Sequence, residues 1–135
     1  NSIFACSFKK EDVKRCLNLS FDEVRSMSST ELNHCAYVVH GYAHHLQLVL
    51  GKEKAVLDWI NDSIYYIVSD KISNYGDSYT KWEQKFYAAV KENPLAKELF
   101  KLKASCLSRV NSLEKTIYPV EKMANMLEQI GRSKI

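Results

Sequence analysis

Residues 32–74, LNHCAYVVHGYAHHLQLVLGKEKAVLDWINDSIYYIVSDKISN, contain the pattern that decides the fold. No proline interrupts this stretch, and its only glycines are Gly41 and Gly51. Apolar side chains recur at spacings of three and four, which is typical of one buried helical face. They are Leu32, Cys35, Val39, Tyr42, Leu46, Leu50, Leu57, Ile60, Ile64, Ile67 and Ile72. A helix of roughly 40 residues is about 60 Å long, so we expect a second helix of similar length to cover this face.

Local signals predict where the long helix begins and ends. Ser28 and Glu31 form a capping box, in which the serine hydroxyl accepts from a backbone N–H and the glutamate reaches back. Gly76 follows the stretch, and glycine is common just past a helix C-terminus. The predicted elements are short helices over residues 1–28, the long helix over 29–75, a connecting helix over 77–92 capped by Asp77 or Ser78, and a long C-terminal helix over 94–131, kinked near Pro119.

The C-terminal third supplies the second long helix. Asn93 and Pro94 mark its start, because asparagine is a frequent cap and proline is tolerated at the first helical position. Its apolar residues are Leu95, Leu99, Leu102, Cys106, Val110, Leu113, Ile117, Val120, Met123, Leu127 and Ile130. Pro119 falls inside this stripe and removes one backbone hydrogen bond, which predicts the kink. Gly131 is expected to end the helix.

Composition favours an all-α fold in a single domain. The chain has 135 residues, of which 46% are apolar, but only four are glycine and two are proline. Sheets need more turn residues than this, and the length suits one domain with a modest core. We expect a long antiparallel helical hairpin with short N-terminal helices. Its two apolar stripes exceed what one hairpin buries, so we also expect assembly into a homo-oligomer.

Cysteine usage and hydropathy favour a cytoplasmic protein with no membrane contact. The four cysteines form no Cys-x-x-Cys pair and are expected to be reduced thiols. The apolar segment over residues 3–8 is too short for a signal peptide. Residues 32–51 carry no Asp, Glu, Lys or Arg and could span a bilayer by length. The asparagine, glutamine and four histidines in that run oppose insertion.

Little in the sequence predicts catalysis, and we expect a non-enzyme without a cofactor. It contains no Gly-x-Ser-x-Gly motif and no glycine-rich phosphate loop. His40 and His44 share one helix face at a spacing that zinc accepts, although Gly41 stands where a hydrolytic zinc helix has glutamate. The alternatives for these histidines are helix packing with polar edges, or a subunit contact that titrates near pH 6.5.

Basic residues alternate with aromatic ones between Tyr75 and Lys103. Lysines that follow a phosphate backbone, with rings that stack on bases, are the combination that holds single-stranded nucleic acid. The alternative is that Trp82 and Phe86, four residues apart, belong to the core while the lysines are only solvated. Burial of these two rings with Val90 and Leu99 would favour that alternative.

Two stretches of the chain resemble phage recombination mediators of the UvsY type. They are LVLGKEKAVLDWINDSIYYIVSDKISNY over residues 48–75 and KFYAAVKENPLAKELFKLKASCLSRVNSLEKTIYPVEKMANMLEQI over residues 85–130. The resemblance implies a small all-α protein that forms a ring-like homo-oligomer, binds single-stranded DNA and helps to load a recombinase onto strands coated by single-strand-binding protein. The family's basic cluster late in its first long helix is replaced here by Asp58-Trp59-Ile60-Asn61-Asp62.

The leading hypothesis is therefore a non-enzymatic single-stranded-DNA-binding mediator. The residues predicted to contact phosphates are Lys52, Lys54, Lys81, Lys85, Lys97, Lys101 and Lys103, and those predicted to stack on bases are Tyr79, Trp82 and Tyr87. The second hypothesis is a structural or adaptor protein, whose helical bundle assembles with itself or with a protein partner and binds no nucleic acid.

Overall fold

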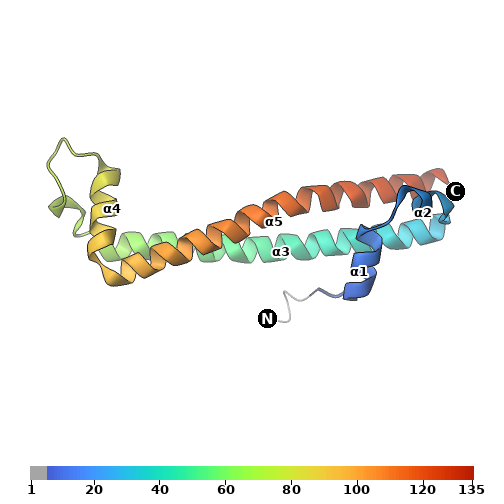
Figure 1. The fold of residues 1–135 in the computed structure, drawn as a ribbon, viewed down its shortest axis with the longest axis horizontal. Helices are drawn as coiled ribbons and strands as arrows, with labels where there is room; N and C mark the ends of the chain where they lie inside the picture. Colours follow the sequence, from blue (N-terminus) through green and yellow to red (C-terminus); the bar gives the residue numbers. More distant parts are fainter. Residues whose placement is uncertain (1–5) are drawn as a thin grey trace. The chain divides into compact units, whose positions relative to one another are not determined.

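The computed structural model describes residues 6–135, and its regular structure over this range is entirely helical. The elements are α1 (Lys10–Leu17), α2 (Phe21–Ser26), α3 (Ser29–Val68), the 3-10 helix η2 (Ile72–Asn74), α4 (Trp82–Glu92) and α5 (Pro94–Ser133). The long helices α3 and α5 run in opposite directions and pack as a hairpin (Figure 1). The predicted all-α hairpin is confirmed. Within the described range, none of the helices combines the length and apolar character needed to cross a membrane.

The described residues form two compact units, each with its own hydrophobic core. Unit 1 contains the residues up to Gly51 together with Ser112–Ile135, and unit 2 contains Lys52–Asn111. Both long helices run from one unit into the other, so the single-domain interpretation stays a prediction. Residues 1–5, which belong to the predicted N-terminal segment and to the apolar stretch over 3–8, lie outside the described range.

The core of unit 1 is made by the apolar stripes of the two long helices and closed by the short N-terminal ones. Leu32 and Val39 of α3 are fully buried, as is Leu127 of α5. Val13 and Cys16 of α1 and Val24 of α2 join the same cluster. Burying one leucine side chain of this kind contributes about 1.5–3 kcal/mol. The short helices are therefore held by apolar contacts with the hairpin.

The described part of unit 1 contains two capping boxes, one of which is the predicted Ser28–Glu31 box. The Ser20 hydroxyl accepts from the Glu23 N–H at 3.2 Å, and the Glu23 carboxylate accepts from the Ser20 N–H at 3.1 Å. Ser28 and Glu31 repeat the arrangement at 3.1 and 3.2 Å where α3 begins. Each box satisfies two backbone donors that a helix N-terminus leaves unpaired.

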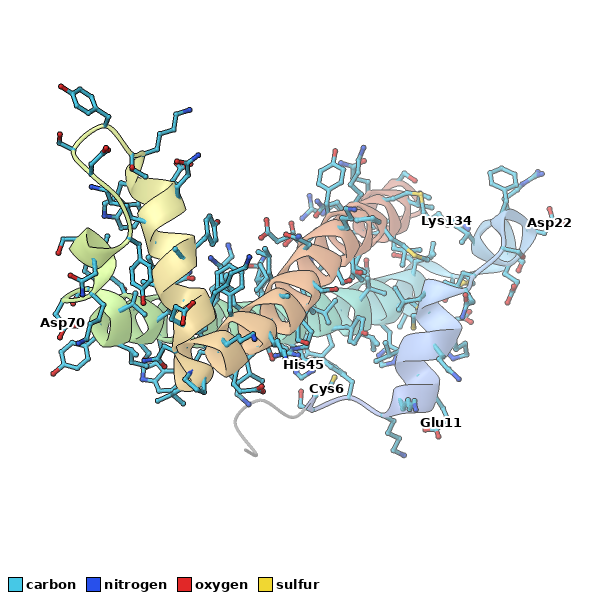
Figure 2. All side chains as sticks on the ribbon, turned by 60° about the vertical axis from the view of Figure 1, so that its left-hand side comes forward. Cys6, Glu11, Asp22, His45, Asp70 and Lys134 are labelled. Atoms are coloured by element: carbon cyan, nitrogen blue, oxygen red, sulfur yellow. The ribbon has the colours of Figure 1, made fainter. Side chains whose placement is uncertain are left out.

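The C-terminal end of α5 differs from the sequence prediction. The helix continues past Gly131 to Ser133. Gly131 is therefore not a helix end, and its missing side chain instead lets α3 approach α5 closely. A Cβ atom there would lie 2.5 Å from Asn33 Oδ1, and the Gly131 carbonyl accepts from the Ser29 hydroxyl at 2.9 Å. Lys134, which follows α5 and is labelled in Figure 2, donates through Nζ to three backbone carbonyls at the end of α2, at 2.8–3.1 Å.

The helix α5 continues through Pro119 without a break. Proline has no backbone N–H, so the carbonyl four residues earlier lacks its helical donor. Pro119 and Tyr118 are exposed, so the interruption lies on a solvent-facing part of the helix. One turn earlier, the Thr116 hydroxyl donates to the Ser112 carbonyl at 2.8 Å. The predicted kink stays a prediction.

In unit 2, α3 ends at Val68, earlier than the predicted end at residue 75. The backbone tightens there, because the Lys71 N–H donates to the Val68 carbonyl at 2.9 Å and the Asn74 N–H to the Lys71 carbonyl at 3.0 Å. Ser69 and Asp70 favour turns, since their side chains compete for backbone groups. The turn brings Ile72 back into the core beside α4, with 7% of its surface exposed.

The connecting helix α4 also begins later than predicted, at Trp82 instead of residue 77. Asp77 caps a turn instead of a helix. Its Oδ1 accepts from the Tyr79 N–H at 2.9 Å and from the Thr80 hydroxyl at 3.1 Å. These bonds hold the pKa of the Asp77 carboxyl below its ordinary value. At the other end of α4, Asn93 Oδ1 accepts from the Ala96 N–H at 3.0 Å, so Asn93 caps α5 as predicted.

Candidate nucleic-acid interface

Five aromatic rings of unit 2 form a continuous series, which we call the aromatic row: Tyr65 of α3, Trp82, Phe86 and Tyr87 of α4, and Phe100 of α5. Trp82 stacks on Phe86 with centroids 5.1 Å apart and on Tyr65 at 6.3 Å. Tyr87 meets Phe86 and Phe100 edge to face, at 5.6 Å in both cases. Such pairs stabilise by about 0.5–1.5 kcal/mol beyond their area burial, so the row links α4 to α3 through Tyr65 and to α5 through Phe100.

The aromatic row is partly open to solvent. Trp82 and Tyr87 are 52% and 51% exposed, and Phe86 is half-buried. Val90 and Leu99 are buried, as the core alternative requires, but Trp82 is not. The core alternative therefore holds only in part, because Phe86 packs against the core of unit 2 whereas Trp82 is exposed. Binding of nucleic acid by this segment stays a prediction.

Three predicted base-stacking residues have different surroundings. Tyr79 lies in the turn before α4 and is 94% exposed. Tyr87 offers about half of its surface at the end of the row nearer α5. Trp82 already stacks on two rings of its own chain. Tyr79 is thus the most exposed of the three, whereas Trp82 and Tyr87 are almost equally exposed and each contacts two rings of the row.

Three of the predicted lysines lie beside the aromatic row. Lys81 is the N-cap of α4 and is exposed, and Lys85 lies one turn later and is half-buried. Lys103 Nζ lies 5.2 Å from the centroid of the Phe100 ring. A cation over a ring face is worth about 0.5–1 kcal/mol at an exposed site. This contact places a positive charge at the α5 end of the row.

The other four predicted lysines are exposed residues of the two long helices. Lys97 is exposed on α5, and Lys101 forms an exposed ion pair with Glu98 at 3.3 Å. Lys52 and Lys54 are exposed on α3, and each interacts with another group of the chain. An exposed ion pair is worth about 0–1 kcal/mol, so Lys101 remains available to a phosphate.

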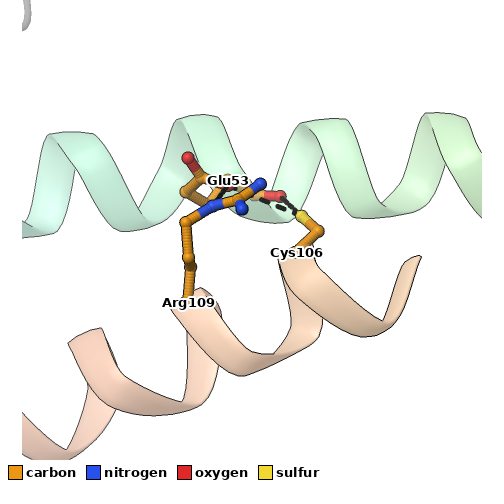
Figure 3. Close-up of polar contacts among 3 residues, drawn as sticks. All are labelled: Glu53, Cys106 and Arg109. Carbon is orange, nitrogen blue, oxygen red and sulfur yellow. Dashed lines mark hydrogen bonds and ion pairs between the residues drawn. The ribbon is translucent and has the colours of Figure 1, made fainter. Parts of the chain in front are cut away.

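Glu53 of α3 stands between Lys52 and Lys54 in the sequence. It forms polar contacts with Cys106 and Arg109 of α5, which join the two helices inside unit 2 (Figure 3). Glu53 Oε2 accepts from Arg109 Nε at 3.0 Å, and Cys106 Sγ donates to the Glu53 carbonyl at 3.3 Å. Burial first, and then the bond to Glu53, raise the pKa of the Cys106 thiol above its ordinary value. The thiol therefore stays protonated, and the charge of Arg109 is paired within the chain.

His40 and His44 line a polar groove of about 390 Å³ in unit 1, together with Gln47, Glu121 and Asn125. Gln47 donates to Glu121 across this groove, and His40 Nε2 lies 3.8 Å from Glu128 Oε2. Among the described residues, no group of three or more His, Cys, Asp or Glu side chains converges as a metal site would require. The contacts agree with the packing alternative for His40.

Sequence reasoning did not assign a role to Tyr65 or to Phe100. Tyr65 stands outside the apolar stripe of α3, and its neighbour Tyr66 offers no signal that separates the two. For Phe100 a signal exists in the sequence, because it stands three residues before Lys103 and residues at that spacing share one helix face. Only the packing of α4 shows which rings join the row.

Comparisons with known proteins give no match. The chain matches no protein-family model and no curated protein, and its structure matches no solved structure. The resemblance to UvsY-type mediators stays a prediction from the two stretches over residues 48–75 and 85–130.

Proposed function

We propose that this protein is a non-enzymatic single-stranded-DNA-binding protein that acts as a recombination mediator. The observation that carries the proposal is the open edge of the aromatic row, where half-exposed Trp82 and Tyr87 lie close to Lys81, Lys85 and Lys103. Half-exposed rings flanked by cations suit a flexible strand whose bases stack and whose phosphates are neutralised. The role in loading a recombinase onto strands coated by single-strand-binding protein comes from the resemblance to UvsY-type proteins.

The mutual stacking of the rings favours this function for a further reason. A strand that binds to rings already held in place immobilises fewer protein side chains, and immobilising a side chain costs about 0.5–1.5 kcal/mol. Tyr79 extends the surface beyond the N-terminus of α4. The proposed path therefore runs from Tyr79 past Lys81 and Lys85 to Tyr87 and Lys103.

Assembly into a homo-oligomer belongs to the same proposal. Unit 2 contains ten basic and eight acidic residues, so the field of one copy is weak. Several copies that contact one strand raise the effective concentration of every later contact, and overall affinity can rise by about 10²–10⁴. We expect single copies to bind DNA weakly and the assembled protein to bind it tightly.

The direct test removes two charges from the proposed path. In Lys81→Ala/Lys85→Ala, the slope of log K against log salt for a fluorescent oligothymidylate should fall by about 1.4, because each lost phosphate contact on a single strand removes about 0.7. The matched control is Lys10→Ala/Lys14→Ala, which removes two exposed lysines with the same spacing from α1 of unit 1. Equal slopes for both variants would exclude the α4 face.

A second readout uses the two tryptophans of the chain, Trp59 and Trp82. In Trp59→Phe, the remaining Trp82 belongs to the aromatic row, so oligothymidylate should quench its fluorescence. In Trp82→Phe, the emission of Trp59 should change little. Quenching of Trp59 alone would place the strand elsewhere on unit 2.

The adaptor hypothesis is the second candidate, and an apolar groove on unit 2, described below, favours it. Light scattering with and without oligothymidylate separates the two candidates. An oligomer that binds the strand more weakly as salt rises supports the mediator. An oligomer that does not bind oligothymidylate even at low salt supports the adaptor hypothesis.

A further inference from the structure

Unit 2 carries an apolar groove of about 520 Å³ that the proposed DNA surface does not use. It is lined by Trp59, Asp62, Ser63, Tyr66 and Ile67 of α3 and by Leu95 and Leu99 of α5. None of these side chains is a member of the aromatic row. We refer to it as the Trp59 groove.

The rim of the Trp59 groove exposes more apolar surface than a helical hairpin needs to. Trp59, Tyr66 and Leu95 are 62%, 84% and 60% exposed. Together they present on the order of 500 Å², which reaches the size of the largest apolar patch on a typical monomer. Leu95 begins the predicted core stripe of α5, yet its side chain lies at this rim instead of inside the hairpin. Patches of this size are most often interaction sites.

The shape of the Trp59 groove suits a third helix. Trp59, Asp62 and Tyr66 follow one line along α3, at spacings of three and four, and Leu95 and Leu99 lie one turn apart on α5. Side chains of a helix laid along two packed helices enter the channel between their ridges. An amphipathic helix docked in this way presents apolar anchors at every third and fourth residue.

The charge of the groove selects among possible helices. Asp62 is the one acidic residue among the described residues that line the Trp59 groove. Asp58, which is also exposed, lies one helical turn before it. Two copies paired through this face would bring like carboxylates toward each other, which is unfavourable. Two concave grooves would also leave each other unfilled. A lysine or arginine on the flank of the docked helix would instead pair with Asp62.

We propose that the Trp59 groove binds an amphipathic helix of a partner protein, with apolar anchors in the groove and a basic flank against Asp62. This site is separate from the proposed DNA surface, so either proposal can fail alone. The occupant is identified by its chemistry as a basic, leucine-rich helical segment.

The test uses Trp82→Phe, in which Trp59 is the one remaining tryptophan and lies at the rim of the groove. The probe is a synthetic helix with leucine at every third and fourth position and lysine on both flanks. Its control is the same peptide with glutamate in place of lysine. Binding should shift the Trp59 emission to the blue, with a Kd below about 100 µM and about tenfold tighter for the lysine peptide.

Two variants decide the outcome. Asp62→Lys changes an exposed residue near the C-terminal end of α3 and should reverse the preference between the two peptides. Leu95→Glu should abolish binding of both peptides, while oligothymidylate still quenches Trp82 when Leu95→Glu is combined with Trp59→Phe. Equal affinity for both peptides, or no binding below the stated Kd, would overturn the proposal. So would a native mass that drops on Leu95→Glu, because the groove would then be filled by a second copy.

Discussion

Gly41→Ala and Gly51→Ala make the same chemical change within one helix, α3, and we expect opposite effects on stability. Alanine favours a helix interior over glycine by about 1 kcal/mol. A Cβ at Gly51 meets nothing within 4 Å, so Gly51→Ala should raise the free energy of unfolding by about that amount. A Cβ at Gly41 would overlap three carbons of the Phe8 ring, all closer than 3.0 Å. That ring must therefore leave its position.

Displacing the Phe8 ring lowers the free energy of unfolding by more than the alanine raises it through its helix propensity. The ring is half-buried against the core of unit 1, which corresponds to about 1–1.5 kcal/mol. It also meets the Tyr37 ring edge to face, with centroids 5.4 Å apart, which adds about 0.5–1.5 kcal/mol. Gly41→Ala should therefore lower the free energy of unfolding by about 1 kcal/mol, leaving a gap of about 2 kcal/mol between the two variants.

Urea unfolding followed by far-ultraviolet circular dichroism measures this gap. A Phe8→Ala background supplies the control, because there Gly41→Ala should stabilise by about 1 kcal/mol, as Gly51→Ala does. The two-mutation cycle isolates the contact between Phe8 and Gly41. If Gly41→Ala stabilised the otherwise unchanged protein as much as Gly51→Ala, the ring would not lie against α3, and the reasoning would be refuted.

Two further predictions concern unit 1. Lys134→Met removes three charge-assisted bonds to the end of α2 and should cost about 1 kcal/mol, seen as faster amide exchange confined to α2. Burial, with the neighbouring Cys35 thiol, raises the pKa of the Cys16 thiol from 9.0 to about 12. The folded state then keeps a proton that the unfolded chain releases, so this stabilisation is complete below pH 9. It is lost between about pH 9 and 12, with a slope of up to about 1.4 kcal/mol per pH unit, and Cys16→Ala should remove that part of the slope in urea titrations across this range.

Local chemistry allowed several features to be predicted from the sequence. The Ser28–Glu31 box begins α3, and Asn93 with Pro94 begins α5, because each depends on atoms within four residues of one another. The apolar stripes predicted the hairpin for a related reason. A spacing of three and four makes one face of a helix apolar whatever lies against it.

Tertiary packing decided the features that local signals could not. Gly131 looked like a helix end, but its missing side chain admits Asn33, a contact that spans most of the chain. Asp77 looked like a helix cap, but it closes a turn that ends before α4 begins.

The candidate site divides in the same way. The sequence by itself determined which residues are aromatic, basic or apolar in unit 2, and that the long helices would pair. Only the tertiary structure decided that Trp82 joins a row with Tyr65 and Phe86, and that Leu95 faces outward. The physical reason is that a side chain's exposure depends on which neighbouring helix covers it. For α4 and the start of α5, that neighbour is α3, which local signals within one helix do not reveal because residues 69–81 separate α3 from α4.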